Sequence, residues 1–252
     1  MVNELVMNAS DAVPDARGLS QIERVFDTFI APSKTFADIR RNASWWLPFL
    51  LMLLFTTAST FVVQHQVGFD RVNENQVRES PRREEALNQL TPEARAISMA
   101  KGAKITGIIS YSVPVFLLIT FAIYALLLWA SFNFGLAAQV TYSQALAVSF
   151  YAALPYLLIN VLTIVTLYVG GNAEAYDYKN PVGTNLGYYM AESAPWLKSL
   201  LGSFDLVKLW SVVLTTIGMS IVARKTILQS AAIVGSLWVL GVLVGVVGAS
   251  FS

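Results

Sequence analysis

The sequence predicts an all-α integral membrane protein, a bundle of five transmembrane helices preceded by amphipathic amino-terminal helices. Of its 252 residues, 55% are hydrophobic and only 13% are charged, with a mean hydropathy of +0.56. This composition is too apolar for an ordinary soluble domain. The uncharged residues also come in long runs, and the run at 105–173 is long enough for two spans, since one span needs about 20 apolar residues.

The amino-terminal region is expected to hold a polar tail followed by two short helices. Residues 1–19 mix acids and polar groups without an apolar core, so they do not resemble a signal peptide. In residues 20–41, Ser20 and Glu23 have the spacing of a capping box, and the following apolar residues recur on one helical face. Pro32 is expected to end the first helix. Two placements remain open for these amphipathic interfacial helices, either in the headgroup region or packed on the ends of the spans.

The membrane domain is expected to cover residues 42–252. The five predicted spans lie at about 45–66, 106–130, 142–169, 204–222 and 227–247. Extramembrane excursions at 70–104 and 170–203 separate them. In the first excursion, Pro81 and Pro92 each follow a hydroxyl residue, which is a typical helix start. We therefore expect two helices there, the second continuing into the next span.

Tryptophan and proline residues mark the expected edges and bends of the spans. Trp45, Trp46 and Trp196 suit the membrane interface, where an apolar ring and a polar N–H are both accommodated. Pro114 and Pro155 fall inside spans, where each removes a backbone hydrogen bond and is expected to kink the helix.

Few polar groups lie at membrane depth. Asp205 and Lys208 are three residues apart at the start of the fourth span, so on a helix they would share a face and could neutralise each other. With Asn160, they form either a functional intramembrane polar cluster or, for the charged pair, an interfacial anchor. In the fifth span, Gly241 and Gly245 form a G-x-x-x-G that is expected to pack closely on a neighbouring helix.

The sequence contains no recognisable catalytic or metal-binding constellation. It has no cysteine and a single histidine, His65, and it lacks the G-x-S-x-G, G-x-x-x-x-G-K and H-E-x-x-H motifs. A formal net charge of +1 gives no argument for nucleic-acid binding. We therefore expect neither enzyme activity nor a cofactor nor a nucleic-acid partner.

Several segments are similar to the Yip family of Ypt/Rab-interacting membrane proteins, and to its bacterial branch in particular. They are IAPSKTFADIR followed by WWLPFLL, then YSQALAVSFYAALPYLL, NPVGTNLG at 180–187 and SFDLVKLW at 203–210. The resemblance implies a cytoplasmic amino terminus and a compact membrane domain of five helices. Eukaryotic members act in vesicle trafficking and bind prenylated small GTPases. This sequence lacks their D-L-Y-G-P element, which puts a GTPase partner in doubt.

Two function classes follow. In the first, the protein is a non-enzymatic scaffold or adaptor that binds membrane lipids and another membrane protein, or shapes lipid through its amphipathic helices. In the second, it moves a lipid or small solute along a polar path. The residues expected along that path are Pro114, Pro155, Asn160, Asp205 and Lys208.

The expected location is a bacterial inner membrane, as a multi-pass protein. Five bases near span ends would share one side of the membrane with the amino terminus and favour the cytoplasmic side for it. These bases are Lys34, Arg40, Arg41, Arg224 and Lys225.

Overall fold

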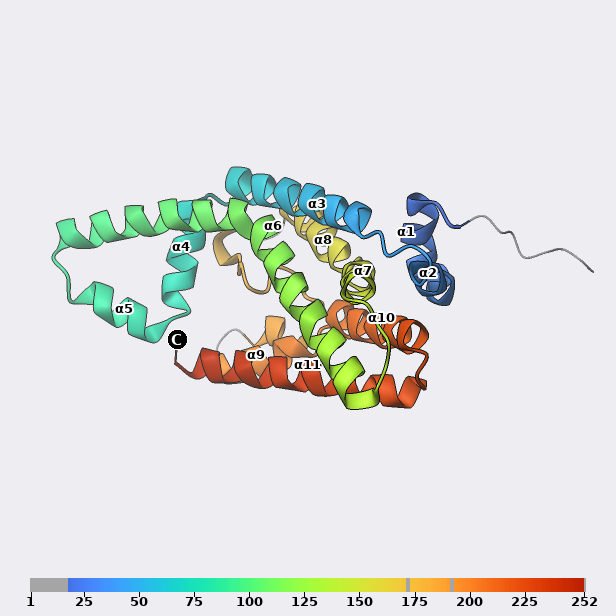
Figure 1. Ribbon diagram of the computed structural model, residues 1–252. Helices are drawn as coiled ribbons and strands as arrows, with labels where there is room; N and C mark the ends of the chain where they lie inside the picture. Colours follow the sequence, from blue (N-terminus) through green and yellow to red (C-terminus); the bar gives the residue numbers. More distant parts are fainter. Residues whose placement is uncertain (1–17, 171–172, 191–192, 252) are drawn as a thin grey trace, which may run out of the picture.

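The computed structural model describes residues 18–251 except 171–172 and 191–192, and that part of the chain folds into helices joined by short loops (Figure 1). Most of the predicted polar tail therefore lies outside the described residues. The elements are α1 (Gln21–Ile30), α2 (Pro32–Ile39), α3 (Trp46–Gln66), α4 (Phe69–Arg78), α5 (Pro81–Asn88), α6 (Pro92–Leu136), α7 (Tyr142–Ala152), α8 (Tyr156–Val169), η1 (Ala173–Ala175), η2 (Leu186–Tyr189), α9 (Pro195–Ser203), α10 (Leu206–Ala223) and α11 (Ile227–Ser250).

The prediction of an all-α protein with five membrane-spanning helices is confirmed. The spans are α3, α6, the α7–α8 pair, α10 and α11, each long and apolar enough to cross a bilayer. The helix α6 has 45 residues, which corresponds to about 67 Å at about 1.5 Å per residue. Because the hydrocarbon core is only about 30 Å thick, the first part of α6 extends beyond it.

Two prolines mark changes of direction in the spans. Pro114 lies inside α6, which bends along its length (Figure 1). Pro155 is the N-cap of α8, and the turn between Ala152 and Tyr156 divides the third span into α7 and α8. A proline has no N–H to donate, so a break in the helix is the expected result.

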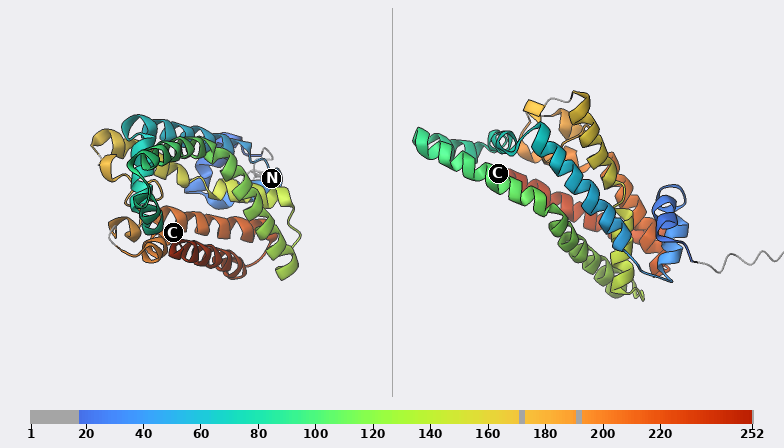
Figure 2. Two further views of the ribbon diagram at one scale, coloured as in Figure 1. Left: turned by 90° about the vertical axis from the view of Figure 1, so that its left-hand side faces the viewer. Right: turned by 90° about the horizontal axis from the view of Figure 1, so that it is seen from above.

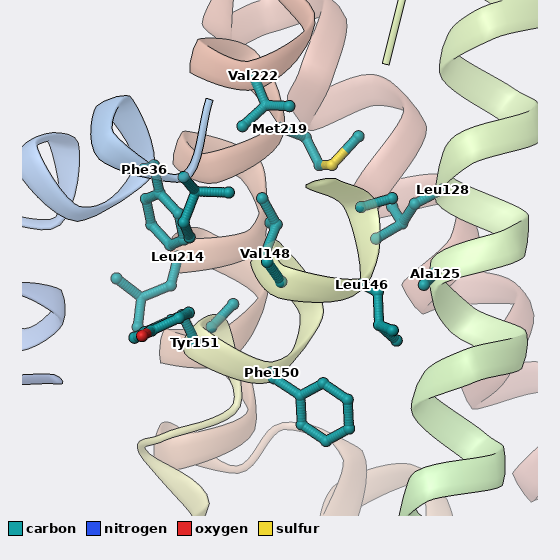
Figure 3. Close-up of a cluster of buried hydrophobic side chains, with 14 of the residues drawn as sticks. Phe36, Ala125, Leu128, Leu146, Val148, Phe150, Tyr151, Leu214, Met219 and Val222 are labelled. Carbon is teal, nitrogen blue, oxygen red and sulfur yellow. The ribbon is translucent and has the colours of Figure 1, made fainter. Parts of the chain in front are cut away.

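The helix α7 forms the centre of the hydrophobic core. All its side chains from Ala145 to Ala152 are buried. Figure 3 shows Leu146 and Val148 in one cluster with Phe36 of α2, Leu128 of α6 and Met219 of α10. Burial on every side explains why the segment is apolar all round and not amphipathic.

One predicted interface anchor takes part in this core. The ring of Trp45 stacks on Phe150 with centroids 5.0 Å apart and planes 14° apart. Trp45 is thus a packing residue. Trp46 and Trp196 are 49% and 46% exposed and keep the exposure that an interfacial anchor needs.

The two amino-terminal helices differ in their packing. The capping box of α1 is present, since Ser20 Oγ accepts from Glu23 N at 3.2 Å and Glu23 Oε2 accepts from Ser20 N at 2.6 Å. The helix α2 begins at Pro32 and buries Phe36 and Ile39 against α7 and α10. The placement on the spans therefore applies to both helices, since the ring of Phe29 on α1 contacts Trp210 of α10 with centroids 5.5 Å apart. The helix α1 differs in keeping a second apolar face outward.

The expected close helix contact at Gly241 is wrong. A Cβ built at Gly241 meets no heavy atom of the described chain within 4 Å, and one at Gly245 makes only an ordinary contact of 3.6 Å with Ser199. Close packing occurs instead at Gly218 of α10, where a Cβ would lie 2.7 Å from Val148 Cγ1. The span α11 lies at the outside of the bundle, so its small residues mostly border open space.

The two excursions meet at the end of the molecule opposite α1 and α2 (Figures 1 and 2). The side chain of Asn75, on α4, donates to the carbonyl oxygens of Glu174 and Tyr176 at 3.1 and 3.0 Å. The two helices predicted in the first excursion are α5 and the start of α6, and α4 is an addition that the sequence analysis missed. These contacts make the two excursions one extramembrane unit.

Candidate functional site

Asp205 is held by four hydrogen bonds at the start of α10. As the N-cap, its Oδ1 accepts from the backbone N–H groups of Val207 and Lys208 at 2.8 and 3.1 Å. Its Oδ2 accepts from Asn185 Nδ2 at 3.1 Å and from Thr184 Oγ1. The residue is only 2% exposed. The carboxylate thus ties the loop before α9 to the first turn of the fourth span.

The loop that contacts Asp205 has its own side-chain hydrogen bonds. Asn180 and Asn185 exchange hydrogen bonds through their amide groups, at 2.7 and 3.1 Å. Gly187 lies so close to α9 that a Cβ would be 2.6 Å from the Lys198 carbonyl oxygen. The segments NPVGTNLG and SFDLVKLW therefore form one structural unit, joined by the hydrogen bonds of Thr184 and Asn185 to Asp205.

The environment of Asp205 favours its charged form. Burial would raise the pKa of its carboxyl group, but the hydrogen bonds from Thr184, Asn185, Lys208 and Val207 lower that pKa below the ordinary value. The group is accordingly a carboxylate at neutral pH, stabilised by donors and by the helix N-terminus.

The ammonium group of Lys208 does not contact the carboxylate three residues before it. Among the described residues no ion pair joins the two; Lys208 Nζ donates to the Gly202 carbonyl oxygen at 2.8 Å. Asp205 precedes the helix, so the side-chain spacing expected of two helical residues does not apply. The spacing allowed an ion pair between the two side chains, and the structure shows none among the described residues.

A second lysine holds the two excursions together. Lys198 Nζ lies 3.1 Å from Glu79 Oε1 and 2.9 Å from Asp177 Oδ2. Burial would lower the pKa of Lys198, but the carboxylates of Asp177 and Glu79 raise it above its ordinary value. The sequence analysis missed this bridge because its members come from three separate segments.

Two cavities meet at Lys208. A polar cavity of about 390 Å³ lies between the excursions and the ends of α9 and α11, and a larger cavity of about 640 Å³ lies among the spans. Ser203 and Lys208 line both, and Asn160 lines the larger one. Pro114, Pro155 and Asp205 are not among the residues that line the larger cavity. The structure thus brings Asn160 and Lys208 to one space and leaves the other expected path residues outside it.

The Yip1 domain family model matches residues 26–249. The chain belongs to the Yip1 family. Comparisons with curated proteins and with solved structures found no match. The matched range contains α2 to α10, both cavities and nearly all of α11, so the site around Lys208 is part of the Yip1 domain.

The described part of this Yip1 domain contains no group of three or more histidine, cysteine, aspartate or glutamate side chains able to hold a metal ion. Its polar site consists of carboxylates already bound to amides, hydroxyls or lysines. The remaining positive charge at the junction of the cavities belongs to Lys208, whose surroundings suit binding of an anionic group.

Proposed function

We propose that this Yip1 protein is a non-enzymatic membrane scaffold that organises or shapes the bilayer through α1. The observation that supports this most is the outward face of α1. Ile22, Phe26 and Ile30 are 64%, 66% and 80% exposed and, being four residues apart, lie on one face of the helix. An amphipathic helix of this kind lies in the interface with its apolar face among the acyl chains.

The helix α1 is rigidly attached to the bundle. Arg24, only 1% exposed, contacts Asp38 of α2 with Nε and Nη2 both 2.7 Å from Oδ2. Arg24 Nη1 also donates to the Asn42 carbonyl oxygen at 2.9 Å, and Tyr151 of α7 donates to Gln21 at 2.8 Å. A wedge fixed in this way transmits its insertion to the whole membrane domain, which is the mechanical requirement for a scaffold.

The same end of the molecule carries a basic hollow. Arg40, Arg41 and Arg224 line a space of about 530 Å³ together with Gln139 and Gln144. Each base near an anionic leaflet contributes about 1 kcal/mol of attraction. Lipids are therefore the first proposed partners, and another membrane protein is the second; a GTPase partner is not proposed.

The orientation that follows puts the amino terminus in the cytoplasm, in a bacterial inner membrane. Reporter fusions after residues 85, 136, 185 and 225 should alternate in side, with those after 136 and 225 cytoplasmic. Alkaline phosphatase and green fluorescent protein activities measure the two sides. Two neighbouring fusions that report the same side would contradict the arrangement.

Replacing Ile22, Phe26 and Ile30 together by serine should abolish most of the membrane-shaping activity. The side chains are exposed, so the melting temperature in detergent should stay within a few degrees of wild type. The measurement is the fraction of tubulated or reduced-diameter vesicles after reconstitution with phosphatidylglycerol and phosphatidylethanolamine, which we expect to fall several-fold.

A matched control replaces Leu240, Leu243 and Val244 of α11 by alanine. These residues are exposed to a similar degree but lie on a span, so vesicle shape should not change. If wild type leaves vesicles unchanged, or if both triple variants act alike, α1 is not a wedge.

A further inference from the structure

The larger cavity lies among the membrane-spanning helices and is bordered by several of them. Its wall includes Met52 of α3, Phe121 of α6, Leu157 of α8 and Val242 of α11. Its volume of about 640 Å³ falls in the range of about 300–1,000 Å³ that is typical of small-molecule sites. A space of this kind, surrounded by hydrocarbon, suits an acyl chain.

The polar end of the cavity is defined by Lys208 and Ser203, which also line the smaller cavity. The ammonium group of Lys208 has three donors and uses one on the Gly202 carbonyl oxygen. The described ion pairs do not include it. An ammonium group at the end of a span without a contacting carboxylate is costly, and an anionic ligand would offset that cost.

The smaller cavity extends this polar end toward the extramembrane unit. Both acidic residues in its lining, Glu79 and Asp177, already form ion pairs with Lys198. Lys179 also lines it, so the cavity has three bases and two acids. Its charge therefore complements a phosphate group and not a cation.

We propose that the two cavities together form a phospholipid site, in which Lys208 binds the phosphate and one acyl chain occupies the space among the spans. The site goes beyond the proposed scaffold function, because no residue of α1 lines either cavity. Its ligand class is a glycerophospholipid with an anionic phosphate, not a soluble phosphate ester.

The first experiment counts phospholipid on the full-length protein purified in mild detergent, by native mass spectrometry. Wild type should retain about one phospholipid per chain. Lys208→Met should bind it about ten-fold more weakly or worse, the loss expected for one charge-assisted hydrogen bond, and Lys208→Arg should restore most of the binding. Equal occupancy in wild type and Lys208→Met would overturn the proposal.

A second variant fills the cavity without touching the charge. A side chain at Gly241 enters open space beside the cavity wall, so Gly241→Leu should fold with an unchanged melting temperature but lose the bound lipid. Gly235→Leu is the matched control, because Gly235 of α11 is also free of close neighbours but lines neither cavity. Loss of lipid in both variants, or in neither, would argue against this cavity as the site.

Three probes added to delipidated protein separate the contributions of phosphate and chain. Dioleoylphosphatidylglycerol should raise the melting temperature of wild type but not of Lys208→Met, whereas dioleoylglycerol, which lacks phosphate, and glycerol 3-phosphate, which lacks chains, should have little effect. If glycerol 3-phosphate raised the melting temperature as much as dioleoylphosphatidylglycerol, the ligand would be a soluble anion and not a lipid. If dioleoylglycerol and dioleoylphosphatidylglycerol raised the melting temperature equally, the phosphate would have no role in binding.

Discussion

Replacing Asp38 by alanine is expected to lower the free energy of unfolding by about 3–5 kcal/mol, because it leaves the guanidinium of Arg24 buried without its counter-charge. Arg24 and Asp38 are 1% and 7% exposed. Both Nε and Nη2 of Arg24 lie 2.7 Å from Asp38 Oδ2. Most of this loss of stability comes from the desolvation of the unpaired Arg24 guanidinium, and less of it from the lost electrostatic attraction to Asp38. Unfolding in detergent, followed by circular dichroism, measures the change.

The double variant Arg24→Met, Asp38→Leu removes both charges and should recover much of the loss, as replacement of a buried pair by apolar residues often does. Arg41→Ala is the control on the same carboxylate. The side chain of Arg41 is 59% exposed and lies 4.0 Å from Asp38, so its removal should cost no more than about 1 kcal/mol. Equal destabilisation by Asp38→Ala and Arg41→Ala would show that the Arg24–Asp38 pair is not what fixes α1.

Local patterns in the sequence were sufficient to predict the spans and several helix starts. Uncharged runs long enough to cross a bilayer have one physical solution, a helix, so all five spans could be located. The starts of α1 and α6 could also be predicted, because each has an N-cap hydroxyl residue. Ser20 accepts from Glu23 N, and Thr91 accepts from Ala94 N. Both are local interactions within four residues.

Interactions between distant segments could not be predicted in this way. Arg24 looks like any base on the polar face of an amphipathic helix, and only the packing of α2 buries it. The Lys198 bridge depends on the meeting of two excursions. A G-x-x-x-G shows that close approach is possible, but whether a neighbour lies there depends on the bundle, and Gly218 has that neighbour where Gly241 has none.

The role of Asp205 as the N-cap of α10 could have been predicted from the sequence. An aspartate directly before an apolar helical run is a typical N-cap. The spacing to Lys208 suggested a pair, but a cap residue lies outside the helix and directs its carboxylate to the backbone N–H groups. Of the two interpretations of the charged pair, only the buried cluster requires that the side chains meet; an interfacial anchor does not.

Replacing Asp205 by alanine should therefore lower the free energy of unfolding by about 2–4 kcal/mol, the sum of a lost cap and of buried donors left without an acceptor. Asp205→Asn is the matched variant, since an amide oxygen still caps the helix, and it should cost less. In the cycle with Lys208→Met, the coupling energy should be near zero because no ion pair joins the two side chains. A coupling above about 1.5 kcal/mol would contradict this geometry.

The charge on Asp205 also predicts a dependence on pH. Its pKa is lowered in the folded state below the ordinary value of 3.8, so the charged form contributes stability that is fully present above that value. The contribution is lost as the pH falls through the folded-state pKa, because the folded protein must then take up a proton on a group that is hydrogen-bonded as a carboxylate. Asp205→Asn lacks this contribution at every pH. The difference in melting temperature between wild type and Asp205→Asn should consequently be constant at neutral pH and shrink below about pH 4; a difference that does not change down to about pH 3 would show that the ionised carboxylate is not the stabilising form.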